Sequence, residues 1–235
     1  MSEAEPSGVN DHRNWDYSDP QEKLYQLGTW GIHSSDIGLI AAQRHERADR
    51  IAALLALEPR DVLLDLGSGM GFMAQRLAPR VHTLHCADIS EVYLADCRAA
   101  VADRANVEFH LIPFADLSAL QGKGVSKVLS TLLFIHFNFY DTVYYLQELH
   151  KIANPGALVF LDFNDGDRFV LGSASDSFND HITDYRRRRG EWQFGCMQMS
   201  SWTLLRNLLP QVGFETLAVY PGRSAFTELV LRKAG

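Results

Sequence analysis

The feature that most constrains the fold of this 235-residue chain is an alternation of short apolar runs and helical patterns between Asp61 and Phe163. Five apolar runs have the length of strands, at 62–66, 82–88, 107–112, 125–131 and 157–163. Helical patterns lie among them at 72–79, 90–103 and 139–152. Because strands that are apolar on both faces pair in parallel and need helical crossovers, this order predicts an α/β fold with helices on both faces of the sheet.

The flanking regions depart from this alternation. Residues 1–14 are polar and acidic, and we expect a disordered tail there. Residues 15–57 begin with scattered aromatic side chains and end in a helical pattern, which predicts an N-terminal cap segment followed by a long helix. Near the C-terminus the pattern predicts a helix at 200–213 and a closing hairpin formed by 215–222 and 226–233.

We therefore predict one core domain, residues 58–235, built on a doubly wound, mostly parallel seven-stranded sheet. The stretch 164–199 interrupts this core after the fifth predicted strand and is long, polar and aromatic. A connection of that length inside a domain is usually functional, so we expect it to be a lid insertion.

Charge and composition limit the classes of partner that we expect the chain to bind. The chain has 22 basic and 29 acidic residues, a formal net charge of −7, which argues against binding nucleic acid or anionic lipid by charge. Its longest apolar stretches are far shorter than a membrane span. Three cysteines, Cys86, Cys97 and Cys196, form no C-x-x-C pair and are expected to be free thiols. We expect a cytoplasmic protein acting on a small molecule.

A glycine-rich turn follows the first predicted strand. Asp65, Gly67, Gly69 and Gly71 give the spacing D-x-G-x-G-x-G, and Phe72 stands where the G-x-G-x-x-G of dinucleotide enzymes has its last glycine. Glycine lacks Cβ, so the backbone can turn sharply and approach a ligand closely. The free N–H groups of the following helix suit an anionic group. The alternative is an ordinary strand–helix turn.

Two acidic residues indicate which kind of ligand the glycine turn binds. A carboxylate just before the turn, Asp65, is poorly placed beside a pyrophosphate but suits an ammonium group. Asp88 ends the second predicted strand, where an acid can hydrogen-bond the hydroxyls of a ribose. An amino acid joined to a ribonucleoside describes S-adenosylmethionine. This pattern disfavours a nicotinamide dehydrogenase.

From Arg60 to Phe163 the ordered series of turn, Asp88 and later strands resembles the class I S-adenosylmethionine-dependent methyltransferases. The resemblance implies a Rossmann-like fold and S-adenosylmethionine as cofactor. Many members have an Asp soon after the third strand to bind adenine, whereas here Phe114 stands there and Asp116 comes later. The cofactor-binding residues that we predict are Asp65, Gly67, Ser68, Gly69, Gly71, Asp88, Ile89, Phe114 and Ser130.

The acceptor side is predicted from the segment after the fourth strand. His136 lies among phenylalanines there, and a histidine with a pKa near 6.5 suits a general base for a hydroxyl acceptor. The alternative is a packed histidine. We expect methyl transfer to a hydroxyl of a small molecule, a sugar or polysaccharide precursor among the candidates. The predicted substrate contacts are Tyr25, Trp30, His33, Asp162, Asn164 and Trp192.

The acids at 162–167 raise the question of a divalent metal such as Mg²⁺, with Asp162 and Asp165 as candidate ligands. The spacing is not that of an EF-hand loop. Metal-dependent sugar methyltransferases pair an acid after the fifth strand with one after the fourth, and Ser130 and Thr131 occupy that earlier place. A solvated hydrogen-bonding loop is therefore favoured over a metal site.

Three other functions compete with this hypothesis. An N-methyltransferase of an amino sugar or other small amine would not need His136 as a base. A nucleic-acid amino-methyltransferase is disfavoured because STLLF replaces the Pro-Pro-aromatic motif that holds a flipped base. A non-catalytic S-adenosylmethionine-binding partner subunit is the third. The sequence leaves the oligomeric state open, a homodimer included.

Overall fold

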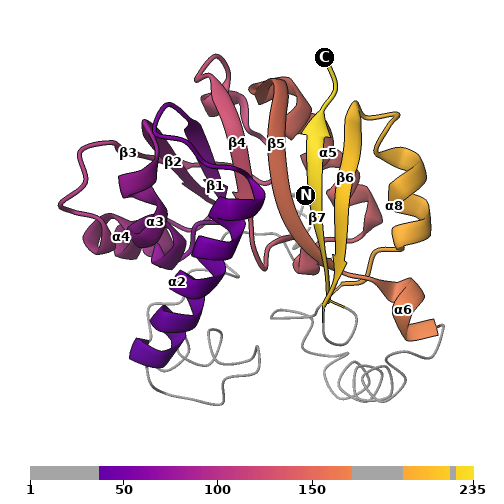
Figure 1. Ribbon diagram of the computed structural model, residues 1–235, viewed down its shortest axis with the longest axis horizontal. Helices are drawn as coiled ribbons and strands as arrows, with labels where there is room; N and C mark the ends of the chain where they lie inside the picture. The colour runs from indigo at the N-terminus through magenta and orange to yellow at the C-terminus, as the bar shows by residue number, and fades with distance from the viewer. Residues whose placement is uncertain (1–36, 171–197, 223–225) are drawn as a thin grey trace, which may run out of the picture.

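In the computed structural model, which describes residues 37–170, 198–222 and 226–235, a seven-stranded sheet runs through the middle of the molecule (Figure 1). Its strands are β1 (Val62–Leu66), β2 (Thr83–Asp88), β3 (Val107–Leu111), β4 (Val125–Ser130), β5 (Ala153–Asn164), β6 (Phe214–Pro221) and β7 (Phe226–Lys233). Their order is β3-β2-β1-β4-β5-β7-β6. The first five are parallel, and β7 is antiparallel to both β5 and β6. The predicted doubly wound fold and closing hairpin are confirmed.

Helices cover both faces of this sheet. The α-helices are α2 (Ile37–Leu54), α3 (Phe72–Leu77), α4 (Glu91–Ala100), α5 (Phe139–Ile152), α6 (Gly166–Val170) and α8 (Trp202–Leu208). Short 3-10 helices are η2 (Ala78–Arg80), η3 (Ser118–Leu120) and η4 (Phe134–His136). The α-helices predicted before β2, before β3 and before β5 are all present.

Local chemistry explains where the helices begin and end. The helix predicted at 72–79 ends at Leu77, because Pro79 has no N–H to continue the α-helical hydrogen bonds and the chain tightens into η2. Helix α4 begins after Ser90, whose hydroxyl accepts a hydrogen bond from the Tyr93 N–H at 3.2 Å. The Asn138 side chain caps α5 in the same way.

Each face of the sheet buries its own hydrophobic core. Successive strand residues point to opposite faces, so Leu63, Leu84 and Cys86 pack against α2, α3 and α4. On the other face Leu64 and Val128 pack against α5 and α8. Almost all of the strand residues that form these two cores are fully buried, which is what sheets covered on both faces require.

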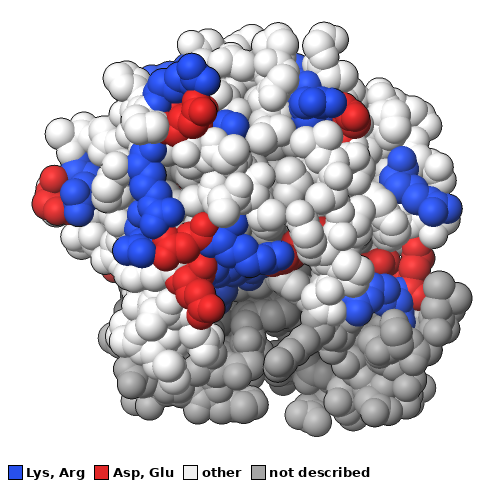
Figure 2. Space-filling model, in the orientation of Figure 1, with Lys and Arg blue, Asp and Glu red and all other residues white. Residues whose placement is uncertain are grey.

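Helix α2 is attached to the sheet by both packing and charge. Ile40, Ala48 and Ile51 are fully buried, as its helical pattern predicts. On the same helix the Arg47 guanidinium is 2.5 Å from an Asp162 oxygen and 3.2 Å from a Glu228 oxygen. Figure 2 shows charged side chains of both signs gathered over this helix. These ion pairs fix α2 to β5 and β7.

Several predictions fall outside the described residues. These are the tail at 1–14, the first part of the cap segment and most of the insertion at 164–199. Of that insertion the structure describes α6 and a bridge between Asp165 and Ser200. Within the described ranges no helix is both long and apolar enough to cross a membrane.

Candidate active site

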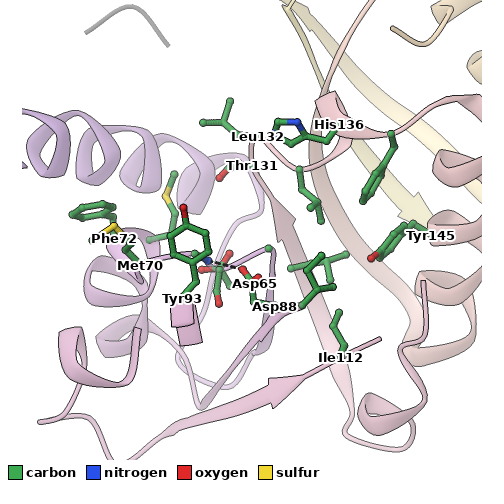
Figure 3. A pocket seen from close by; sticks show the side chains of 18 of the residues that line it. Asp65, Met70, Phe72, Asp88, Tyr93, Ile112, Thr131, Leu132, His136 and Tyr145 are labelled. Atoms are coloured by element: carbon green, nitrogen blue, oxygen red, sulfur yellow. Dashed lines mark hydrogen bonds between the residues drawn. The ribbon is translucent and has the colours of Figure 1, made fainter. Parts of the chain in front are cut away.

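A cavity of about 190 Å³ opens at the carboxyl ends of β1, β2 and β4 (Figure 3). This is where the strand order reverses between β1 and β4, the place where open α/β sheets bind ligands. The residues that line the cavity come from α2, the end of β1 and the glycine turn, α3, α4, η4, α5 and the ends of β2, β3 and β4. They are Arg44, Asp65, Leu66, Gly67, Ser68, Gly69, Met70, Phe72, Met73, Asp88, Ile89, Tyr93, Ile112, Phe114, Thr131, Leu132, Leu133, His136, Phe137 and Tyr145.

The glycine turn forms one wall of the cavity. Gly67 has a φ of 76°, in the left-handed region that favours glycine, and a Cβ there would lie 3.2 Å from the Leu133 side chain. Gly71 has a φ of 81°, and a Cβ there would lie 2.9 Å from the Cys97 Sγ. Gly67 and Gly69 line the cavity, whereas Gly71 is not among the lining residues and lets α3 pack closely on α4.

Asp65 is a buried acid with unused hydrogen-bonding capacity. Its Oδ2 atom is buried and has no hydrogen-bond partner among the described residues. Burial, and secondarily the nearby Asp88 carboxylate, raises the pKa of Asp65 to about 7. A buried carboxylate without a partner is costly unless a ligand compensates it. The predicted ammonium group of S-adenosylmethionine would do so.

Asp88 points into the same part of the cavity as Asp65 (Figure 3). Its carboxylate accepts hydrogen bonds from the Gly69 N–H at 2.9 Å and the Ser90 N–H at 3.0 Å. These bonds hold the carboxylate in place at the end of β2. Asp88 stands at the end of β2, where an acid can hydrogen-bond the hydroxyls of a ribose.

The end of the cavity beyond Asp88 is apolar. Ile89, Phe114 and Ile112 line it. The Phe114 ring is held edge-on by Phe137 and Tyr145, with ring centroids 5.7 and 5.3 Å away. Asp116 lies outside the lining, and its carboxylate accepts the Ser118 N–H at 2.9 Å. A flat adenine ring would therefore contact Ile89 and Phe114 in preference to Asp116.

The segment after β4, residues 131–133, forms another wall of the cavity. Leu132 adopts a φ of 59°, which is strained for a residue with a side chain. Its N–H donates a hydrogen bond to the Asp162 Oδ1 at 2.7 Å, and Asp162 also pairs with Arg47. Burial raises the pKa of Asp162 to about 6. Asp162 thus holds the segment that lines the cavity and is not itself a lining residue.

His136 lies in η4 and lines the cavity beside Leu132 and Leu133 (Figure 3). Burial lowers the pKa of His136 to about 4. The imidazole is therefore neutral at physiological pH and can accept a proton or a hydrogen bond. The low pKa also makes it a weaker base than a solvent-exposed histidine.

Arg44 is a cavity residue that no sequence pattern indicates. Its guanidinium lies in the cavity wall, and no ion pair joins it to an acid within the described ranges. Burial, and then the charge of Arg47, lowers its pKa to about 10, so it stays positively charged at neutral pH. A half-buried guanidinium of this kind suits a carboxylate.

The remaining predicted residues are placed away from the cavity or outside the described ranges. Ser130 is buried and donates to the Leu66 carbonyl at 2.9 Å, which bridges β1 and β4. Asn164 donates to the Gln198 carbonyl at 3.3 Å, and Asp165 accepts from the Trp202 and Asp167 N–H groups. The predicted substrate contacts Tyr25, Trp30, His33 and Trp192 lie outside the described ranges.

The oxygen atoms of Asp162 and Asp165 are already used within the fold. Asp162 is engaged by Leu132 and Arg47, and Asp165 caps a turn and the start of α8. Within the described ranges the two acids do not belong to a group of three candidate metal ligands. The preference for a hydrogen-bonding loop over a Mg²⁺ site stays a prediction.

Comparison with known proteins finds a family match for one segment of the chain. Residues 63–156 match the family model of a methyltransferase domain. The matched segment contains the glycine turn and Asp88, and together with the fold it supports a methyltransferase domain in this part of the chain. The free carboxylate oxygen of Asp65 and the glycine turn fit S-adenosylmethionine, the cofactor that the sequence predicts.

Individual relatives are more distant. A ribosomal RNA small subunit methyltransferase A from Rubrobacter xylanophilus is 41% identical over 54 residues, which cover 23% of this chain and 21% of that protein. The match therefore spans about a fifth of that curated relative.

Among solved structures, magnesium protoporphyrin IX methyltransferase (ChlM) from Synechocystis PCC 6803, with bound SAH, superposes with a TM-score of 0.65 at 17% identity, covering 96% of this chain and 98% of that one. The N-methyltransferase NodS from Bradyrhizobium japonicum WM9, in complex with S-adenosyl-L-homocysteine, gives 0.63 at 12% identity, covering 96% and 100%. At these identities the likeness shows the fold.

Proposed function

We propose that this protein transfers a methyl group from S-adenosylmethionine to a hydroxyl of a small molecule, with sugars and polysaccharide precursors as the first class to test. The observation that carries the proposal is that one cavity is lined both by the two acids that suit the donor and by a neutral histidine that can receive a proton. The cavity is mainly apolar around these groups, so it can exclude water from the transfer.

The donor side of the proposal assigns one residue to each chemical group. Asp65 holds the ammonium, Arg44 the carboxylate and Asp88 the ribose hydroxyls. Ile89 and Phe114 contact the adenine. When bound, S-adenosylmethionine supplies a methyl group on a positively charged sulfur. The protein contributes the alignment of donor and acceptor, the step that gives the largest gain in an in-line displacement.

On the acceptor side, His136 is the proposed general base. Its neutral imidazole accepts the hydroxyl proton as the new carbon–oxygen bond forms. Leu132 and Leu133 lie next to it and keep water away from the reacting atoms. The strained backbone of Leu132, fixed by Asp162, holds this part of the wall in one conformation.

A second candidate function is methylation of a small amine. The pKa of His136, about 4, favours this alternative because such a weak base gives limited help to a hydroxyl. A neutral amine has its own lone pair and needs no base to attack the methyl group. His136 would then accept a hydrogen bond from the acceptor.

The test is a screen of the purified full-length chain against hydroxylated metabolites, small amines and RNA, with release of S-adenosylhomocysteine as the readout. With a hydroxyl acceptor, His136→Gln should lower kcat by roughly 10²- to 10⁴-fold and change S-adenosylhomocysteine affinity by less than about threefold. The exposed His82 provides the matched control, His82→Gln, with an unchanged rate.

Each outcome of the screen identifies one function. Turnover of amines that is insensitive to His136→Gln would establish the amine alternative. Turnover of RNA alone would contradict a small-molecule acceptor. A chain that binds the donor and methylates nothing would indicate a non-catalytic partner subunit.

A further inference from the structure

A cluster of three potential metal ligands lies on β2 and β3, outside the cavity. His85 is in the middle of β2, and Glu108 and His110 are on the edge strand β3. His85 is the register partner of Glu108, and His110 is the partner of Ala87. Since alternate strand residues share a face, all three side chains project from the face that carries α5.

The ligand atoms are close enough to hold one ion. The His85 Nδ1 is 3.1 Å from the His110 Nε2 and 3.6 Å from the Glu108 Oε2. The His110 Nε2 and the Glu108 Oε2 are 4.0 Å apart. A point equidistant from these three atoms lies about 2.1 Å from each, which matches zinc–nitrogen and zinc–oxygen bond lengths. The three groups therefore need little movement to bind one ion.

We propose that His85, Glu108 and His110 form a binding site for a divalent transition-metal ion of the zinc type, distinct from the methyl-transfer cavity. Two imidazoles and one carboxylate are a common zinc ligand set and leave a fourth position for water. This set of nitrogen and oxygen ligands also favours zinc, copper or nickel over Mg²⁺ or Ca²⁺.

Burial and charge around the cluster agree with this assignment. The side chains of His85 and His110 are 2% and 12% exposed, whereas Glu108 is 49% exposed, so an ion can enter from the Glu108 side. In the metal-free protein the His85 Nδ1 and the His110 Nε2 share one hydrogen bond, so an ion bound between them would replace the proton of that bond. A bound ion would join the edge strand to its neighbour.

Lys123 gives the site a distinctive property. Its ammonium lies 3.0 Å from the same Glu108 oxygen that faces the histidines. A metal ion and this ammonium compete for one carboxylate and repel each other. Removal of the lysine charge should therefore tighten metal binding, an effect that a metal bound elsewhere would not show.

The test uses the untagged full-length protein after chelator treatment, with Co²⁺ as a spectroscopic probe and Zn²⁺ as its competitor. We expect about one tightly bound ion per chain and the visible absorption of a nitrogen- and oxygen-ligated cobalt. His110→Ala and Glu108→Gln should each weaken binding by at least about tenfold. The exposed His82, just before the start of β2, gives the matched control His82→Ala, with binding unchanged.

Lys123→Gln should strengthen Zn²⁺ binding severalfold. The proposal is overturned if the wild-type chain binds no ion, or if His110→Ala binds as tightly as the control. It is also overturned if Lys123→Gln leaves the affinity unchanged. Thermal melts in chelator confirm that each variant folds, so that a loss of binding is not a loss of structure.

Discussion

At the scale of single residues, Asp65 holds a carboxylate in a buried position, where its ionised form costs free energy. Asp65 is buried, its Oδ2 has no partner within the described ranges, and its pKa is raised to about 7. Such a group reduces the stability of the free protein, and we propose that a cationic ligand compensates it. Stability and cofactor affinity should therefore respond in opposite directions when Asp65 is changed.

The Asp65→Asn variant tests whether stability and cofactor affinity change in opposite directions. The variant keeps the side-chain shape and removes the buried charge. We expect the free energy of unfolding at about pH 8 to rise by roughly 1–3 kcal/mol, because an unsatisfied buried group is removed. S-adenosylhomocysteine affinity should fall at least about tenfold, because the ammonium loses its counter-ion. Denaturant unfolding and calorimetry measure the two effects, and a variant that weakens both would contradict this account of Asp65.

The raised pKa of Asp65 also predicts how pH affects each property. A folded-state pKa raised above the unfolded value means that stability from this group is complete below about pH 4 and is lost as pH rises through 7. Cofactor affinity changes with pH in the opposite direction to stability, since the bound ammonium favours the ionised carboxylate. S-adenosylhomocysteine affinity should therefore fall as pH is lowered from about 8 to 6, by up to tenfold per unit below 7.

Calorimetry across this pH range provides the measurement, and Asp65→Asn is its control. The variant has no carboxyl group to titrate at this position, so its affinity should vary much less with pH. An affinity of the wild-type chain that stays constant from about pH 8 to pH 6 would contradict the assignment of the ammonium to Asp65.

Asp65 and Asp88 could be predicted from sequence, but Arg44 could not. The two acids are read from the ends of apolar runs next to a glycine turn, and parallel strands bring those ends together. Arg44 reaches the cavity because of how α2 docks on the sheet. That docking depends on ion pairs with Asp162 and Glu228, which are far away in the sequence. No local pattern encodes them.

At the scale of elements, the glycine turn matters as much for helix packing as for the cofactor. Gly71 ends the turn where α3 meets α4, and a Cβ at this position would lie 3.0 Å from the Cys97 Cα and 2.9 Å from its Sγ. The motif spacing alone assigns Gly71 to the cofactor. Its contacts show a packing role, since the cavity is lined by Gly67 and Gly69.

Gly71→Ala should therefore act mainly on stability. We expect a loss of roughly 2–4 kcal/mol in unfolding free energy, because the added methyl group meets backbone that cannot move away and the φ of 81° is strained for alanine. The matched control is Gly122→Ala, where φ is 75° but a Cβ would meet nothing within 4 Å. Denaturant unfolding that shows equal losses for the two variants would leave strain alone as the cause.

Asp162 shows that a sequence pattern can place an acid at the end of a strand without giving its role. The place of Asp162 after an apolar run predicts a substrate contact or a metal ligand. In the structure its two oxygens hold Leu132 and Arg47. A carboxylate at a strand end can serve a ligand or the fold, and only the three-dimensional neighbours distinguish the two roles.

At the scale of the whole molecule, the sheet order explains why one cavity collects residues from so many segments. The order reverses between β1 and β4, so connections leave in opposite directions and open a crevice there. The parallel core and the C-terminal hairpin were predictable because apolar runs, helical patterns and turn residues alternate regularly. The position of β7 between β5 and β6 followed from no sequence signal, because register and order depend on packing.

Calorimetric titration of S-adenosylhomocysteine tests whether the cavity binds the methyl donor through Asp88. The titrant is added to the wild-type chain, to Asp88→Asn and to the surface control Asp103→Asn, whose side chain is 72% exposed. We predict one site in the wild type, roughly 10- to 100-fold weaker binding in Asp88→Asn, and unchanged binding in Asp103→Asn. Absence of wild-type binding, equal affinity in Asp88→Asn, or tight binding of NADH in its place would contradict the account.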